Sequence, residues 1–157
     1  MKKILFVCTG NICRSPTAEG VARAMAAERG LKTQLAFDSA GTESFHVGDP
    51  PDTRSCARAK LRGYDISGLR ARRVAPADFR EFDLVVAMDR GHLKQLERMC
   101  PSDYRHKLKL FLSYGADREA VDVPDPYYGD ERGFDEVLDL CERAMGPLLD
   151  AVADPPQ

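Results

Sequence analysis

The sequence has no run of eighteen apolar residues, so we expect no transmembrane helix. It also lacks the pattern of a signal peptide, because the apolar stretch after the two N-terminal lysines covers only Ile4–Cys8 and no small-residue cleavage site follows it. The five cysteines do not have the spacing of a disulfide framework, which is typical of a reducing compartment. These absences together predict a cytoplasmic protein.

An excess of charge of one sign is also missing. The formal net charge is −2, so nothing predicts nucleic acid or an anionic membrane as a partner. A local cluster of basic residues, formed by Arg70, Arg72 and Arg73, is interpreted as a solvated face.

Two common kinds of site motif are absent. The cysteines are scattered, and neither C-x-x-C nor a Cys/His cluster with zinc spacing occurs, so we expect no metal and no cofactor. The nucleotide-binding pattern G-x-x-x-x-G-K-[ST] is missing as well. No internal repeat or long linker divides the chain, which indicates one domain over residues 1–157, with about the last five residues forming a flexible tail.

Apolar runs alternate with helical patterns along the chain. Strands are expected at residues 4–7, 35–38, 83–88 and 108–112. Helices are expected at residues 16–29, 52–61, 89–99 and 134–152, with Asp89 as the cap of the third. A loop rich in proline, aspartate and glycine covers residues 120–132. This alternation predicts a three-layer α/β domain with a central parallel sheet and helices on both faces.

Cys8 ends the first expected strand, and parallel sheets bind their ligands beyond the carboxyl ends of the strands. The loop after it leads directly into a helix, whose first amides carry partial positive charge and have no internal partners. A curled loop at this point directs several N–H groups at one spot and forms an anion nest, for which Gly10 and Asn11 tolerate the necessary backbone angles. The candidate phosphate-binding residues are Thr9, Gly10, Asn11, Ile12, Cys13, Arg14 and Ser15.

Two side chains of this segment add chemistry to the nest. Arg14 can place a bidentate fork on phosphate-like oxygens. Cys8 in a field of positive charge is expected to be a thiolate near neutral pH, and a thiolate beside a bound phosphate is a nucleophile directed at phosphorus. The residues alone leave two alternatives open: Cys8 is a small core residue, or Cys8 and Cys13 form a redox pair.

An acid is expected near such a thiolate, because a phenolate leaves more easily if it is protonated as its bond breaks. Asp125 is the candidate, since it lies between Pro124 and Pro126 in a segment that cannot be helical. Asp122 and Asp130 are competitors nearby, and an aspartate between prolines is also ordinary in turns.

The pattern Cys8, five residues, Arg14, Ser15 is the signature of cysteine-dependent phosphatases, and CTGNICRSPTAEG at residues 8–20 resembles the low-molecular-weight protein tyrosine phosphatases. The resemblance continues in the same order along the chain, with DSAGT at 38–42, AMDR at 87–90 and DPYYGD at 125–130. It implies a flavodoxin-like fold with a central four-stranded parallel sheet. It also implies hydrolysis of phosphotyrosine and small aryl phosphates in two metal-free steps through a phosphocysteine.

The resemblance further implies a role for each matching residue. Cys8 would attack phosphorus, while Arg14 and the loop amides would hold the equatorial oxygens. Ser15 would stabilise the thiolate, and Asn11 and Ser39 would hydrogen-bond together and keep the loop in shape. Asp125 would be the general acid, and then the base for the attacking water.

Three aromatic residues are expected at the rim of the site: Phe45, Tyr127 and Tyr128. They could form a slot for a flat ring, and Phe45 stands where the family often has Trp or Tyr. The two tyrosines also match residues that some relatives have phosphorylated. His46 is placed at the rim, whereas His92 and His106 are expected on the surface, so no Cys–His dyad is predicted.

The sequence also distinguishes the tyrosine phosphatase interpretation from other possible functions. Thioredoxin-coupled arsenate reductases need two further cysteines a few residues apart, but Cys56 and Cys100 are far apart. In the family a threonine after the asparagine goes with phosphoarginine, so Ile12 favours phosphotyrosine. A non-catalytic phosphoprotein-binding module would be expected to have lost Cys8, Arg14 or Asp125, and all three are present.

The expected partners are a tyrosine-phosphorylated protein and inorganic phosphate, the latter as product and competitive ligand. The chain is expected to be a monomer or a weak dimer. A further hypothesis concerns Cys13, which is close enough in the loop to trap an oxidised Cys8 as a reversible disulfide. If Cys13→Ser recovered from peroxide as fully as the parent, this hypothesis would be wrong.

Overall fold

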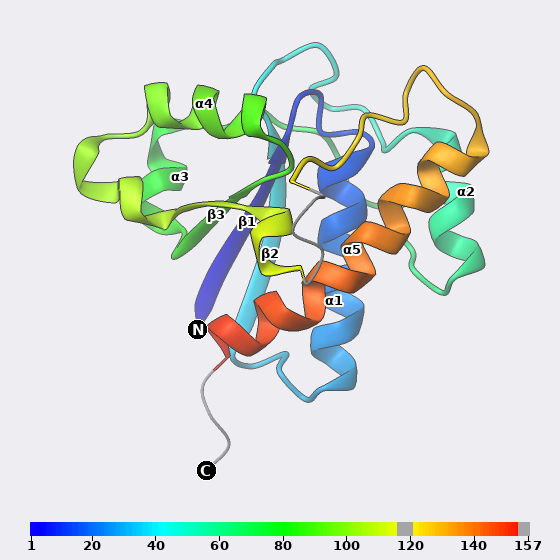
Figure 1. Cartoon of the computed structure of the whole chain (residues 1–157), viewed down its shortest axis with the longest axis horizontal. Coiled ribbons are helices and arrows are strands. Elements are labelled where there is room, and N and C mark those ends of the chain that lie inside the picture. Colours follow the sequence, from blue (N-terminus) through cyan, green and yellow to red (C-terminus); the bar gives the residue numbers. More distant parts are fainter. Residues whose placement is uncertain (116–120, 154–157) are drawn as a thin grey trace.

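The computed structural model describes residues 1–115 and 121–153, and these form one four-stranded sheet covered by helices (Figure 1). All strand pairs are parallel, and the strand order is β2-β1-β3-β4. The strands are β1 (Lys2–Cys8), β2 (Leu35–Gly41), β3 (Leu84–Ala87) and β4 (Leu108–Leu110). The predicted three-layer, flavodoxin-like architecture with a central four-stranded parallel sheet is confirmed.

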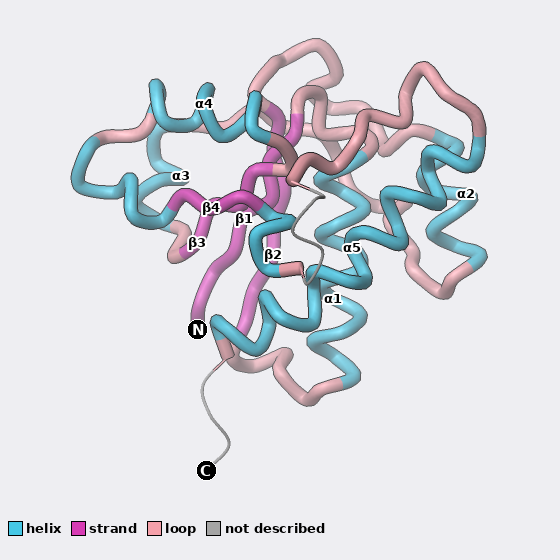
Figure 2. The backbone as a smooth tube through the Cα atoms, viewed as in Figure 1, coloured by secondary structure: helices cyan, strands magenta, loops and turns pink. Residues whose placement is uncertain are grey.

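Five α-helices and two short 3₁₀ helices surround the sheet in the part of the chain that is described (Figure 2). The α-helices are α1 (Arg14–Glu28), α2 (Thr53–Leu61), α3 (Pro76–Glu81), α4 (Arg90–Met99) and α5 (Glu131–Val152). The 3₁₀ helices are η1 (Ser102–Lys107) and η2 (Phe111–Tyr114). None of the described helices is long and apolar enough to cross a membrane.

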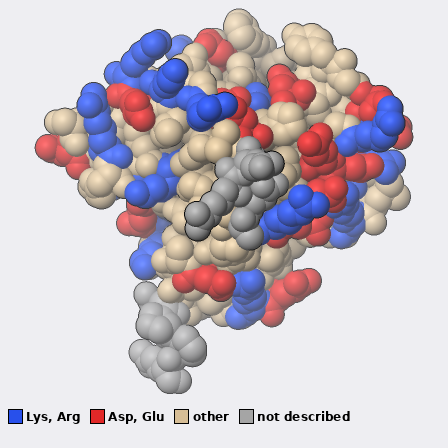
Figure 3. Space-filling view, viewed as in Figure 1, with Lys and Arg blue, Asp and Glu red and all other residues tan. Residues whose placement is uncertain are grey.

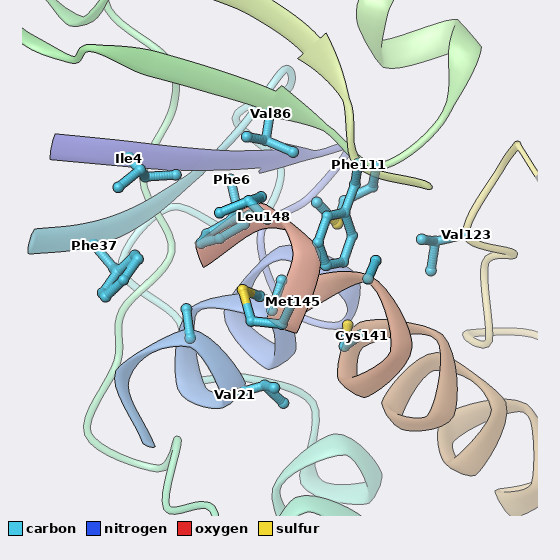
Figure 4. Packing of buried hydrophobic residues seen from close by; sticks show 14 of the residues in the cluster. Ile4, Phe6, Val21, Phe37, Val86, Phe111, Val123, Cys141, Met145 and Leu148 are labelled. Atoms are coloured by element: carbon cyan, nitrogen blue, oxygen red, sulfur yellow. The ribbon is translucent and has the colours of Figure 1, made fainter. Parts of the chain in front are cut away.

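Alternate side chains of β1 face opposite sides of the sheet, as the two-residue period of a strand requires. Ile4 and Phe6 pack with α1 and α5, where Met145 and Leu148 lie against the sheet (Figure 4). The intervening residues of β1 pack with α3 and α4 on the other face. Because both faces of β1 are buried, its sequence is a continuous apolar run.

Several element boundaries differ from the expectation. The helix α5 begins three residues earlier than predicted, because Asp130 caps it by accepting a hydrogen bond from the backbone N–H of Arg132 (3.0 Å). The fourth strand ends at Leu110, and the chain then turns into η2. The short helices α3 and η1 were not expected at all. The predicted tail lies outside the described residues from 154 onward, as do residues 116–120, which include the start of the predicted loop.

Acidic and basic side chains are interspersed over the face of the molecule drawn in Figure 3. Arg72, however, is not the solvated side chain that was expected. Its guanidinium lies 3.0 Å from Asp38 and 3.0 Å from Asp78, so it joins β2 to α3. Its role is structural, because it links segments far apart in the sequence.

Candidate active site

The candidate site lies at the carboxyl end of β1, where the strand order changes direction. Cys8 is the last residue of β1 and is 3% exposed, and α1 begins six residues later at Arg14. The Cys8 Sγ lies 2.9 Å from the Oγ of Ser15, which is fully buried in the first turn of α1. The Ser15 hydroxyl can therefore donate a hydrogen bond to a Cys8 thiolate, and it is placed where it could hold that thiolate within the loop.

Asn11 shapes the loop between them. Its φ of 59° is left-handed, the only such value of a non-glycine residue among those described. Its Nδ2 donates to Ser15 Oγ (2.8 Å), and its Oδ1 accepts from the backbone N–H of Arg72 (3.0 Å). Asn tolerates this backbone conformation better than most residues, and both ends of its amide are used.

The expected hydrogen bond between Asn11 and Ser39 is not among the contacts of the described residues. Ser39 Oγ donates instead to Glu19 Oε1 (2.7 Å), a carboxylate buried on α1. The Ser15 Oγ also lies 3.5 Å from the carbonyl of Ala40 on β2, which can accept the single hydroxyl hydrogen only when that hydrogen is not donated to Cys8. Ser39 thus braces α1 against β2 and does not touch Asn11 directly.

We expect Asn11→Ala to lower the free energy of unfolding by about 2–3 kcal/mol. Two buried hydrogen bonds of about 1 kcal/mol each are lost, and alanine in a left-handed conformation costs about 1 kcal/mol more. Asn11→Gly loses the same bonds without the backbone strain, so it should fall between the parent and the alanine variant. Urea unfolding of the three proteins measures this, and equal midpoints for parent and alanine variant would contradict the assignment.

Arg14 is buried at 5% exposure and held from several sides. Its Nη1 donates to Asp89 Oδ2 (2.8 Å) and to the carbonyl of Val123 (3.1 Å). Asp89 is also the cap of α4, as predicted, since its Oδ1 accepts from the backbone N–H of His92 (2.8 Å). One carboxylate therefore begins a helix and orients the arginine.

The prediction that His92 lies on the surface is wrong. It is 4% exposed, and its Nε2 lies 2.7 Å from Thr9 Oγ1 and 3.4 Å from Arg14 Nη2. Burial and the neighbouring Arg14 charge lower the pKa of His92 to about 4, so the ring is neutral at neutral pH. His106 is exposed, as expected. The sequence places His92 three residues after the cap Asp89. This spacing indicates a role for the backbone N–H of His92, but it does not reveal what the ring contacts.

A pocket of about 280 Å³ opens above Cys8. Its lining combines the phosphate-loop residues with the expected rim residues: Cys8, Thr9, Gly10, Ile12, Cys13, Arg14, Phe45, His46, Asp125, Tyr127 and Tyr128. Phe45 and Tyr128 are largely exposed, at 76% and 90%, while Tyr127 is 39% exposed. Asn11 in the loop and Ser15 in the first turn of α1 are buried, and neither lines the pocket. The fold therefore brings three sequence segments, 8–14, 45–46 and 125–128, to one opening.

Asp125 is the only one of the three candidate acids that lines this pocket. Its Oδ1 accepts from the backbone N–H of Tyr127 (3.0 Å), and its Oδ2 lies 3.9 Å from Arg14 Nη2. Asp122 pairs with Arg90 (2.9 Å), and Asp130 caps α5. Of the three candidates, Asp125 therefore lies at the pocket, whereas Asp122 and Asp130 are engaged elsewhere.

Arg54 on α2 is a residue of the site that the sequence did not reveal. Its Nη2 donates to the carbonyl of Tyr127 (3.0 Å), and its guanidinium lies over the rings of Tyr127 and Phe134 at 5.5 and 4.6 Å. Asp52 fixes the guanidinium through Oδ2 (3.0 Å), while its own backbone N–H donates to the carbonyl of Ile12 (2.8 Å). This chain of contacts joins the phosphate loop to the loop that carries Asp125.

The two cysteines of the loop differ in their environment. Burial raises the pKa of Cys13 to about 12, with a smaller contribution from nearby acidic groups, so Cys13 remains a neutral thiol. Cys8 has the Ser15 hydroxyl beside its sulfur and is the loop cysteine suited to be a nucleophile. Within residues 1–115 and 121–153, no group of three or more His, Cys, Asp or Glu side chains could hold a metal ion.

Comparisons with known proteins indicate independently which family this chain resembles. The family model described as "Low molecular weight phosphotyrosine protein phosphatase" matches residues 3–156. A low molecular weight protein-tyrosine-phosphatase of Streptomyces coelicolor is 44% identical, over 97% of this chain and 94% of the relative. The crystal structure of a protein tyrosine phosphatase from Entamoeba histolytica superposes with a TM-score of 0.93 at 39% identity, covering 96% of each chain. A drosophila arginine phosphatase superposes with a TM-score of 0.90 at 31% identity, covering 99% of this chain and 100% of the other.

Proposed function

Since the chain belongs to the low molecular weight phosphotyrosine protein phosphatase family and is a phosphatase, we propose that it hydrolyses phosphotyrosine through a phosphocysteine on Cys8. The observation that carries this is the pocket itself. It places Cys8, Arg14 and Asp125 around one opening, with Ser15 Oγ 2.9 Å from the Cys8 sulfur.

In the first step the Cys8 thiolate attacks phosphorus, so the S–P bond forms as the bond from phosphorus to the tyrosine oxygen breaks. Asp125 gives its proton to that oxygen and becomes a carboxylate. The amides of residues 9–15 and the guanidinium of Arg14 hold the equatorial oxygens, whose charge distribution they match best in the transition state. These groups supply the positive charge that the transferring phosphoryl group needs, so the proposal includes no metal.

In the second step water attacks the phosphocysteine. The Asp125 carboxylate takes a proton from the water, the P–S bond breaks, and inorganic phosphate forms. Cys8 leaves as a thiolate, and the Ser15 hydroxyl stabilises that charge by donating a hydrogen bond. Phosphate is therefore both the product and a competitive ligand.

The pocket walls favour an aromatic phosphate ester. Phe45 and Tyr127 line the pocket from two different segments of the chain, and aromatic side chains suit contact with a flat phenol ring. Ile12 gives the pocket lining an apolar side chain in place of a hydroxyl that could engage a guanidinium. Both features favour phosphotyrosine over phosphoserine and phosphoarginine.

The test is hydrolysis of matched phosphotyrosine, phosphoserine and phosphoarginine peptides in the presence of EDTA. We expect the highest kcat/KM for phosphotyrosine and no loss of activity with EDTA. A preference for phosphoarginine would leave the mechanism intact but overturn the interpretation of Ile12. Reduction of arsenate in a thioredoxin-coupled assay without any hydrolysis would overturn the function.

Arg54 is expected to support Asp125 by holding the carbonyl of Tyr127. Arg54→Ala should lower kcat about tenfold for aryl phosphates with poor leaving groups, because a slight misplacement of the acid is costly. Arg54→Lys keeps the charge but not the planar fork, so it should restore little of the activity. In an Asp125→Ala background the Arg54→Ala substitution should cause almost no further loss of kcat, because Arg54 acts only by positioning Asp125. A full tenfold loss in that background would show that Arg54 acts on the substrate instead.

The wider setting follows from the same proposal. Residues 1–157 would act as one phosphatase domain in the cytoplasm, as a monomer or weak dimer, on tyrosine-phosphorylated proteins and not on nucleic acid or membranes. Cys13 lies in the same pocket lining as Cys8, which supports its role as a partner for reversible oxidation.

A further inference from the structure

His92 is a buried titratable residue that the proposed mechanism does not use. It lies in the first turn of α4, on the side of the phosphate loop, and its ring touches Thr9 and Arg14. Neither residue beside it is apolar at the point of contact, so the ring is not merely filling space in the core. We therefore asked what the ring does to the groups it touches.

The contacts decide which ring nitrogen carries the proton. Arg14 has only N–H groups to offer, so the Nε2 that faces its Nη2 at 3.4 Å is an acceptor. The proton of the neutral ring is then on Nδ1, which lies 3.0 Å from Asp89 Oδ1 but without hydrogen-bond alignment. The Thr9 hydroxyl accordingly donates to Nε2 across 2.7 Å, and this leaves the Thr9 oxygen free to accept.

Arg14 is the group that uses this oxygen. Its Nη2 lies 3.4 Å from Thr9 Oγ1, while both hydrogens of Nη1 are directed to Asp89 and Val123. His92 Nε2 lies at the same 3.4 Å from Nη2 and adjoins the Thr9 hydroxyl, so one N–H of Nη2 can be shared between them, and three of the five N–H groups of the guanidinium are then engaged by the protein. The N–H of Nε and the second N–H of Nη2 remain, and these two form one edge of the planar fork.

We propose that His92 and Thr9 form a positioning pair that fixes the rotation of the Arg14 guanidinium, so that its Nε–Nη2 edge faces the phosphoryl group. The neutral, Nδ1-protonated ring is essential to this arrangement. A second proton on Nε2 would face the Arg14 cation and would reverse the Thr9 hydroxyl. This inference rests on the proposed function, since it concerns how the same site holds its substrate.

The charges around the ring support the neutral form. Arg14 on α1 faces it from below, whereas Asp89 at the start of α4, and Asp122 and Asp125 on the loop before α5, favour the charged form. Burial and Arg14 outweigh these three carboxylates, and the pKa of His92 falls to about 4. At the pH of an ordinary assay, Nε2 of His92 is therefore unprotonated and can accept the hydrogen bond from the Thr9 hydroxyl.

The test compares Thr9→Val, His92→Leu and the double variant, with His92→Gln as the conservative replacement. Thr9→Val keeps the shape of the side chain and removes the hydroxyl, while Gln offers an amide oxygen near the place of Nε2. We expect each single variant to lower kcat for an aryl phosphate about tenfold, because the fork is misoriented. The affinity for inorganic phosphate should fall alongside, the double variant should be no worse than the poorer single variant, and His92→Gln should recover most of the loss.

The outcomes separate the inference from the function. If Thr9→Val retains parental kcat and His92→Gln is as impaired as His92→Leu, His92 only fills space and the inference fails. If His92→Leu does not fold, as circular dichroism would show, Thr9→Val alone decides. Cys8→Ser measured in the same series tests the function independently, since its activity would overturn the phosphocysteine whatever Thr9 and His92 do.

Discussion

Replacement of Cys8 by serine is expected to abolish turnover of phosphotyrosine, with a loss in kcat of at least about 10⁴-fold, as for other enzymes that lose their nucleophile. A serine hydroxyl is not ionised at neutral pH, so the loop amides and Arg14 would hold the phosphate without an attacking group. Binding should survive, because the nest is made by the backbone and by Arg14.

Cys56→Ser is the matched control for this loss. Cys56 is half-buried on α2 and does not line the pocket, and its Sγ lies 3.7 Å from the carbonyl of Pro51. Its replacement by serine should leave kcat within about twofold of the parent, as expected for a substitution away from the site. If Cys8→Ser kept more than a hundredth of the parental kcat, the covalent mechanism would be wrong.

Replacement of Asp125 by alanine should produce a loss that depends on the leaving group. For phosphotyrosine, whose phenolate needs a proton, kcat should fall about 10²–10⁴-fold. For an aryl phosphate with a strongly acidic phenol, formation of the phosphocysteine should be slowed far less, because that leaving group departs without help. Rates of phenol release in the pre-steady state measure this step directly.

Asp122→Ala is the control, because Asp122 is another carboxylate of the same loop that pairs with Arg90. It should show no dependence on the leaving group. A uniform loss for Asp125→Ala across all leaving groups would mean that Asp125 binds substrate and does not protonate it.

Much of the fold follows from local patterns in the sequence. The run Ile4–Cys8 is buried on both faces, so its continuous apolar character predicted a central parallel strand. Gly30 (φ 71°) ends α1 as its sequence position indicated. The short helix α3 was not predicted because six residues show no clear helical period of apolar residues. The start of α5 was predicted too late because its cap, Asp130, lies in a segment whose composition is typical of a loop.

The candidate site could be predicted from the sequence only in part. Cys8 to Ser15 form one segment, from which the anion nest, Arg14 and a candidate nucleophile were predicted, while Asp125 and the rim residues were predicted with the help of the family resemblance. Arg54 and His92 reach the site from α2 and α4, and only the packing of these helices shows what their side chains touch. The predicted hydrogen bond between Asn11 and Ser39 is wrong for the same reason, because the Ser39 hydroxyl donates to Glu19 on α1 instead.

The most direct measurement is mass spectrometry of Asp125→Ala after rapid mixing with an aryl phosphate that has a good leaving group. This variant should form the phosphocysteine and then hydrolyse it slowly, because the base for the second step is gone. We predict one added phosphoryl group, located on the peptide that contains Cys8. The same group on another residue, or turnover of this variant with no trapped adduct and no burst of phenol, would contradict the account.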